Sequence, residues 1–159
     1  MKYIIIGGVA GGASTAARLR RLDERAEILL FEKGEYISYA NCGLPYYIGG
    51  VISDRERLFV QTPESFANRF GIGVKVLSEV TRIDPERKKV EVKDLKSGEV
   101  YEEGFDKLVL SVGAEPIFPP LEGIRTEGIF SLRNVRDTDR ILSEVTRIDP
   151  ERKKVEVKD

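Results

Sequence analysis

The one cysteine of this chain, Cys42, is the first candidate for a residue that does chemistry. It lies in the run SYANCGLPYY, which covers residues 38–47. No second cysteine can close an intrachain disulfide, so we expect either redox chemistry at one sulfur or an inert buried thiol. Ser38 and Asn41 carry groups that can hydrogen-bond to the sulfur or to a thiol substrate. A helix beginning within residues 43–47 would stabilise a thiolate through its N-terminal dipole.

A second candidate is the glycine-rich run GGVAGG at residues 7–12. Glycines let an anion approach backbone amides without a Cβ in the way, and amides at a helix N-terminus attract phosphate. Glu32 ends the next apolar run, where a carboxylate can accept hydrogen bonds from an adenosine ribose. This order of strand, loop, helix, strand and acid predicts a dinucleotide site. Val9 replaces the middle glycine of the usual GxGxxG pattern, so a tight turn without a ligand stays the alternative.

The elements that must position these residues follow an α/β pattern. Short apolar runs at residues 3–6, 27–31 and 107–110 suit parallel strands buried on both faces. A helix is expected over 13–22, and its place between the first two runs indicates a right-handed βαβ unit. Ser111 follows the third run, at the edge where open α/β sheets bind ligands. The prediction is a Rossmann-like domain with a parallel sheet.

A small antiparallel β-meander is expected between the second and third of these runs. Thr62 and Pro63 are a helix N-cap and first-turn proline, and the helix should end near Gly71. A further strand is expected at residues 74–76. The strands of the meander are expected at residues 80–83, 90–92 and 99–101.

Residues 142–159 repeat residues 77–94 letter for letter, as LSEVTRIDPERKKVEVKD. Solenoids need three or more units of longer period, so a recent duplication, a recombination event or deliberate engineering explains the copy better. We expect the copy to form an extra β-hairpin. It would either add to a sheet edge or compete with the first copy for its place. Identical strands also offer a route to a swapped homodimer.

The composition limits the classes of partner. With 26 basic and 27 acidic side chains the formal net charge is −1, which gives no attraction to nucleic acid or to an anionic membrane. The apolar run before Gly7 is too short for a signal peptide or a membrane span, so we expect a cytoplasmic protein. The chain has no histidine, and no metal site is expected. The basic run at residues 18–21 is expected to be a solvated face, and the partner a small molecule.

Three runs together resemble the FAD-binding portion of the pyridine nucleotide-disulfide oxidoreductases: GGVAGGAS, FEKGEYISYANCGLPYYIGG and LVLSVGAEP. The resemblance covers residues 1–141. Within the family, the runs resemble more narrowly the branch of coenzyme A-disulfide reductases and NADH oxidases. It implies that residues 1–141 are an FAD-binding domain and that FAD is the cofactor. The residues it assigns to FAD are Gly7, Gly8, Val9, Ala10, Gly11, Gly12, Glu32, Lys33, Val80, Ser111, Val112 and Gly113. For Val80 the alternative is a hairpin core residue, and for Lys33 a solvated lysine.

The resemblance also implies a role for Cys42. Dithiol members of the family carry a CxxxxC pair here, whereas this chain has Tyr47 at the second position. In the resembling enzymes one thiol receives electrons from the reduced flavin. It alternates between thiolate and either a mixed disulfide with coenzyme A or, in the oxidases, a sulfenic acid. The acceptor is then a small-molecule disulfide or oxygen.

Resembling enzymes continue beyond a segment like residues 132–141 into an NAD(P)H domain and a dimerisation domain, for which these residues show no counterpart. NAD(P)H is therefore expected as the electron donor only in a full-length relative. Two hypotheses stay open. The chain is the FAD-binding portion of a single-cysteine flavin oxidoreductase, or it is a nucleotide-binding module or duplicated fragment without turnover. The sequence does not choose among coenzyme A disulfide, oxygen and polysulfide, nor between NADH and NADPH.

Overall fold

The computed structural model describes residues 1–149 and 154–157, with side chains up to residue 144. The chain forms two compact units. The first unit combines residues 1–39 and 59–113, and the second combines residues 40–58 with the described residues after 113. No helix among the described residues is long and apolar enough to cross a membrane.

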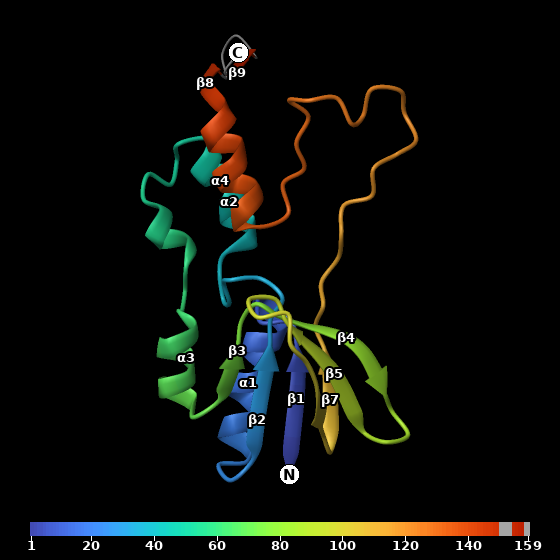
Figure 1. The fold of residues 1–159 in the computed structure, drawn as a ribbon. Helices are drawn as coiled ribbons and strands as arrows, with labels where there is room; N and C mark the ends of the chain where they lie inside the picture. The colour runs from blue at the N-terminus through green and yellow to red at the C-terminus, as the bar shows by residue number, and fades with distance from the viewer. Residues whose placement is uncertain (150–153, 158–159) are drawn as a thin grey trace. The chain divides into compact units, whose positions relative to one another are not determined.

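A parallel four-stranded sheet with the order β3-β2-β1-β7 forms the centre of the first unit (Figure 1). The strands are β1 (Lys2–Ile6), β2 (Glu27–Phe31), β3 (Gly73–Lys75) and β7 (Lys107–Leu110). The Rossmann-like α/β fold predicted from the sequence is confirmed, and β2 and β7 have the predicted bounds. Because all neighbours pair in parallel, the carboxyl ends of the strands meet at one edge of the sheet.

Helix α1 (Ala10–Leu22) connects β1 to β2 and covers one face of the sheet. Its buried Ala13 and Ala16 pack in one cluster with Ile5 and Leu30 of the strands. Small side chains at these positions let the helix lie close to the sheet. The sequence predicted a start at residue 13, and the structure starts the helix three residues earlier. Glycines have low helix propensity, but here the packing of the glycine run overrides that preference.

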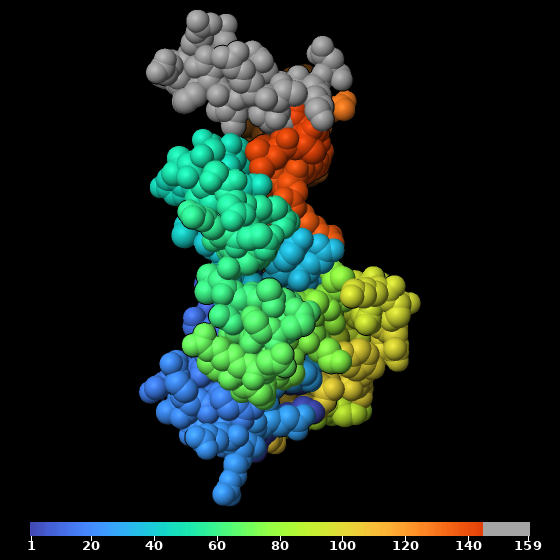
Figure 2. Space-filling view, turned by 90° about the vertical axis from the view of Figure 1, so that its left-hand side faces the viewer, coloured from blue at the N-terminus to red at the C-terminus, as the bar shows by residue number. Residues whose placement is uncertain are grey.

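Helix α3 (Pro63–Phe70) has the predicted caps. The Thr62 hydroxyl accepts a hydrogen bond from the Ser65 amide at 3.1 Å, and Gly71 ends the helix with a left-handed φ of 60°. Phe66 of α3 is buried in the same hydrophobic cluster as Ala13 and Ala16 of α1. The outer side of this helix is exposed and lies on the surface of the first unit in Figure 2.

Arg20 corrects the expectation that the basic run 18–21 is only a solvated face. Its guanidinium donates hydrogen bonds to the carbonyl oxygens of Phe70 at 2.8 Å, Gly71 at 2.7 Å and Glu24 at 2.7 Å. These carbonyls lie at or just after the C-terminal ends of α3 and α1, where helices leave carbonyls without a partner, so the arginine joins the two helix ends.

A three-stranded antiparallel sheet lies over the other face of the parallel sheet. Its strands are β4 (Ser78–Asp84), β5 (Lys89–Asp94) and β6 (Val100–Gly104), in that order. The predicted meander is thereby confirmed. Val90 and Val92 of β5 are fully buried and pack with Ile4 and Phe31. A register shift in β4 leaves Thr81 as an extra residue opposite β5, as in a β-bulge.

The second unit contains short helices and a hairpin. Its helices are the 3-10 helices Asn41–Gly43 and Arg55–Leu58, α2 (Leu44–Ile48) and α4 (Val135–Glu144). Helix α4 contacts α2, and Arg55 donates to both carboxylate oxygens of Asp139 at 2.9 and 2.7 Å. Between residues 114 and 134 the chain has no helix or strand, and three prolines interrupt it.

Helix α4 also corrects the bounds of the predicted tail hairpin. The hairpin was expected from Leu142, but residues 142–144 form the last turn of α4. Strands β8 (Val145–Asp149) and β9 (Lys154–Val157) follow and pair antiparallel. A strong N-terminal cap favours the helix, because Asn134 Oδ1 accepts from the Asp137 amide at 3.0 Å.

Candidate functional site

The glycine run lies at the carboxyl edge of the parallel sheet, where β1 ends and α1 begins. Gly7 has a φ of 96°, which suits glycine alone. A side chain at Gly7 would overlap the Ser111 carbonyl, and one at Gly12 would overlap the Gly7 carbonyl. Close packing of the main chain therefore requires both glycines, with or without a ligand.

The other two glycines are confined by side chains rather than by the main chain. A Cβ on Gly8 would lie 2.7 Å from Ile37 Cγ2 and 2.9 Å from Leu30 Cδ2. A Cβ on Gly11 would lie 2.5 Å from the Ser111 hydroxyl oxygen. The Ser111 amide in turn donates to the Ile6 carbonyl at 2.8 Å. The end of β7 is thus packed against the glycine run, which brings together residues that are far apart in the sequence.

The N-terminus of α1 is suited to an anion. Val9 is the N-cap residue and makes no side-chain capping bond, and the first turn contains no acidic residue. Ala10 and Gly11 in that turn are exposed. A 13-residue helix carries partial positive charge at this end, so a pyrophosphate would supply the missing acceptors.

Glu32 stands beside this helix end. Its Oε2 accepts a hydrogen bond from the Gly8 amide at 2.7 Å, and its Oε1 accepts from the Gly34 amide at 2.7 Å. These bonds fix the carboxylate next to the glycine run. An ionised carboxylate has about four acceptor positions, so positions remain for hydroxyl groups of a ligand. Sequence reasoning found this acid from its place after β2 but missed its bonds to Gly8 and Gly34.

The remaining residues assigned to the nucleotide lie in the same unit. Lys33 makes an ion pair with Glu79 at 2.9 Å, and its side chain is 65% exposed. Val80 packs against the cluster of Val90 and Val92, as the alternative interpretation expected, and its contact with adenine stays a prediction. After β7, Val112 is exposed and Gly113 has a left-handed φ of 70°.

Ser38 has an unusual backbone. Its φ of 48° lies in the left-handed region, which costs a residue with a Cβ roughly 1–2 kcal/mol. Two hydrogen bonds hold it there: its amide donates to the Gly8 carbonyl, and its carbonyl accepts from the Val60 amide, both at 2.9 Å. Such strain is often found at functional sites. No pattern in the sequence indicated it.

Cys42 belongs to the second unit, in the 3-10 helix Asn41–Gly43. Its thiol is free and exposed, which differs from the alternative of a buried thiol. The buried Gly43 follows, and a Cβ there would lie 3.2 Å from Leu58 Cδ2. Helix α2 begins directly afterwards, as predicted, and is five residues long. Asn41 is also exposed.

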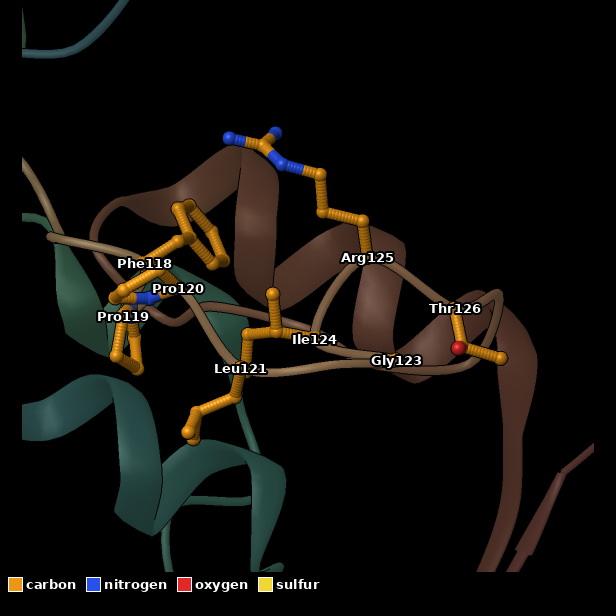
Figure 3. Close-up of a pocket in the computed structure, with 8 residues that line it drawn as sticks. All are labelled: Phe118, Pro119, Pro120, Leu121, Gly123, Ile124, Arg125 and Thr126. Carbon is orange, nitrogen blue, oxygen red and sulfur yellow. The ribbon is translucent and has the colours of Figure 1, made fainter.

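A hollow of about 600 Å³ lies in the second unit along the segment 118–126 (Figure 3). Figure 3 shows Leu121 and Arg125 pointing to opposite sides of this loop. The Arg125 guanidinium lies 5.5 Å from the centre of the Phe118 ring. The lining contains no acid, no thiol and no residue predicted from the sequence, so the candidate site does not depend on it.

Comparison with known proteins decides the family. The family described as pyridine nucleotide-disulphide oxidoreductase matches residues 1–158. The chain belongs to this family. Among curated members, the coenzyme A disulfide reductase of Staphylococcus aureus strain JH9 is 46% identical over 140 residues. That match covers 88% of this chain but only 31% of the reductase, so the chain spans less than a third of that relative.

Solved structures of the family share the fold. A reduced CoADR-RHD from Bacillus anthracis has a TM-score of 0.86 and 56% identity, covering 88% of this chain and 25% of that one. An NAD-dependent persulfide reductase from A. fulgidus has a TM-score of 0.84 and 36% identity, over 90% and 26% of the chains. A water-forming NADH oxidase from Lactobacillus brevis has a TM-score of 0.82 and 30% identity, over 92% and 33%.

Proposed function

We propose that this chain is the FAD-binding portion of a flavin-dependent oxidoreductase that uses Cys42 as its one redox thiol. One observation carries the binding part of the proposal. Glu32 is hydrogen-bonded to Gly8 beside a helix N-terminus that no side chain caps. The edge therefore presents amide donors for a pyrophosphate and carboxylate acceptors for ribose hydroxyls, the two needs of an adenine dinucleotide.

Different residues of the chain would bind different parts of FAD. The first turn of α1 would hold the pyrophosphate, and Glu32 would orient the adenosine ribose. The main chain of residues 111–113, packed on the glycine run, would approach the flavin nucleotide, and Lys33 and Val80 would line the adenosine. FAD, when bound, would supply two-electron transfer from NAD(P)H. Ala10 and Gly11 in the first turn of α1 are exposed, so the ligand can approach them from the outer side.

Cys42 would carry the thiol chemistry. Its thiolate attacks a small disulfide, forms a mixed disulfide and releases one substrate thiolate. Two electrons then cleave the mixed disulfide, releasing the second substrate thiolate and restoring the Cys42 thiolate. Ser38 and Asn41 would hydrogen-bond the sulfur or the substrate. The relatives named above as coenzyme A disulfide reductase and persulfide reductase support a small sulfur compound as acceptor. The name NADH oxidase supports oxygen as the other choice.

The second candidate is a nucleotide-binding module without turnover. The short coverage of the relatives favours it for the chain by itself, because the match spans 31% of the reductase. We therefore expect weak FAD binding and negligible NADH oxidation by these residues alone. A cytoplasmic location and a homodimer stay predictions.

Titration of FAD against the purified chain, followed by quenching of flavin fluorescence, tests the binding part. We expect a band at about 450 nm in the complex and weaker binding by Glu32→Ala. Cys42→Ser is the matched control, because it should leave FAD binding unchanged. Folded protein that binds neither FAD nor ADP would contradict the proposed site.

Intact mass measurement after incubation with coenzyme A disulfide tests the thiol part separately. The expected product is one mixed-disulfide adduct, absent from Cys42→Ser. No adduct on the native chain would make Cys42 a bystander. Rapid bleaching of bound flavin by NADH would show turnover and exclude the module.

A further inference from the structure

The two identical segments form hairpins with the same backbone register. In the first hairpin Val80 pairs with Val92, and in the second Val145 pairs with Val157. Each has its register shift directly after that pair. The later pairs also correspond one to one. In the first hairpin they are Arg82 with Glu91, Ile83 with Val90 and Asp84 with Lys89. In the second they are Arg147 with Glu156, Ile148 with Val155 and Asp149 with Lys154. The described strands of the second hairpin, residues 145–149 and 154–157, therefore have the pairing that the position of the first requires.

The position of the first hairpin depends on contacts that its own residues make. Strand β5 pairs with β6, and Val90 and Val92 are 0% exposed against Ile4 and Phe31. The main chain at the start of the segment is also held, since the Ser78 amide donates to the Glu32 carbonyl at 2.9 Å. The hairpin's own residues in these contacts recur in the second copy, where Val155, Val157 and Ser143 correspond to Val90, Val92 and Ser78.

The ground state nevertheless keeps the first copy in place. It is joined to β3 and β6 by the short segments 76–77 and 95–99, so little chain entropy is lost when it docks. The second copy must also release residues 142–144 from α4 before they can act as strand. One exposed ion pair, between Arg140 and Glu144 at 3.1 Å, opposes that release. Surface pairs of this kind are weak.

We propose that residues 142–159 are an exchangeable replacement for residues 77–94 in the same chain. The site they bind is the edge of β6 together with the face of the parallel sheet that carries Ile4 and Phe31. The connecting residues 111–141 would reach about 100 Å when extended, which gives the copy ample range. A tethered segment acts at an effective concentration on the order of millimolar, above the micromolar level of a second molecule. Exchange within one chain is therefore favoured over a swapped dimer.

Aspartate substitutions in each copy test this proposal. Val90→Asp with Val92→Asp makes the first copy unfit for its buried position, and Val155→Asp with Val157→Asp does the same to the second. The readout is hydrogen exchange of β6 and β1, with light scattering on the eluted protein for its mass. The second-copy variant is the matched control and should retain native protection.

The proposal requires a specific order of results. The first-copy variant should keep amide protection in β6 as a monomer, and the variant with all four substitutions should lose it. Loss of protection in the first-copy variant would overturn the proposal, because the second copy then does not replace the first. Protection that survives all four substitutions would also overturn it, since the site then tolerates aspartate. Protection that exists only in a dimer would show exchange between molecules and reject exchange within one chain.

Discussion

The two copies of LSEVTRIDPERKKVEVKD have one sequence but begin in different secondary structures. In the first copy Leu77 has a left-handed φ of 50°, and Ser78 already pairs in β4. In the second copy residues 142–144 are the last turn of α4. From Val80 and Val145 onward the two hairpins share one register. The strands and bulge are therefore set by the segment itself, and its first residues are set by the preceding chain.

The helical start of the second copy follows from cooperativity. Starting a helix is costly and extending one is easy, so α4, once capped at Asn134, continues into Leu, Ser and Glu. The first copy has no helix before it. There β3 ends at Lys75, and the Leu77 amide donates to the Gly34 carbonyl at 3.0 Å, which fixes a turn instead. The comparison shows tertiary context overriding local preference in the same three residues.

Val92→Ala and Val157→Ala should give the largest difference between the copies. Val92 is fully buried, so its truncation should lower the free energy of unfolding by about 2 kcal/mol through lost burial and a cavity. The described second hairpin has only two strands, which bury little, so Val157→Ala should change it by less than about 0.5 kcal/mol. Urea denaturation followed by circular dichroism measures both. Equal losses would mean that both hairpins are equally packed.

Ser78→Ala and Ser143→Ala should have opposite signs. The buried Ser78 hydroxyl donates to the Val76 carbonyl at 3.1 Å, so its removal should cost about 1 kcal/mol. Ser143 is exposed in α4, where its hydroxyl donates to the Arg140 carbonyl at 2.7 Å. Alanine is the better helix former, so Ser143→Ala should stabilise by roughly 0.3–0.5 kcal/mol. Urea denaturation followed by circular dichroism also compares these two variants, and changes of the same sign would contradict the expected difference between helix and strand.

Lys88→Gly should stabilise the turn of the first hairpin. Lys88 is exposed and has a φ of 52°, so glycine would relieve strain and lose no buried surface. We expect a gain of up to about 1 kcal/mol. Lys93→Gly is the matched control, because Lys93 is also exposed but lies within β5, where glycine should destabilise. A loss at both positions would mean that the turn carries no strain.

Sequence patterns predicted most of the first unit because its strands are short apolar runs with clear glycine and proline boundaries. The bounds of strands β2 and β7 were predicted to the residue, as were the N-cap and first residue of α3, whose end was predicted near Gly71. The early start of α1 was missed, since only the fold shows that the Gly12 position touches the Gly7 carbonyl. The left-handed Ser38 was missed because long-range bonds to Gly8 and Val60 hold it. The last turn of α4 was missed because residues 142–144 belong to the copied segment, for which a hairpin was predicted, and no element was predicted for residues 135–141.

The candidate site likewise contains residues that the sequence could assign and contacts that only the structure shows. The glycine run and Glu32 are close together in sequence around one βαβ unit, so the sequence alone could assign them. Ser111 reaches the glycine run through the pairing of β7 with β1, whereas the sequence placed it only at the ligand-binding edge of a parallel sheet. The bonds from Glu32 to Gly8 and Gly34 depend on side-chain geometry and needed the structure.

The smallest expected difference concerns Asp94, the last residue of the first copy. Hydrogen bonds from the Ser97 and Lys96 amides, at 2.9 and 2.7 Å, lower the pKa of its carboxyl. Both donors lie in the turn that joins β5 to β6. A lowered folded-state pKa means that the stabilisation is present above the unfolded value of about 3.9 and is lost as pH falls through the folded value. Carbon-detected NMR titration of Asp94 measures that pKa directly.

Asp94→Ala should remove this acid-dependent step from the turn between β5 and β6. The matched variant is Lys96→Ala, which keeps the donating amide and should keep the low pKa, because main-chain bonds are the principal cause. The carboxyl holds only this turn, so the effect should appear in local amide exchange at residues 94–99 before it appears in global unfolding. An Asp94 carboxyl that titrates at its ordinary value would show that residues beyond the copied segment do not brace the first hairpin.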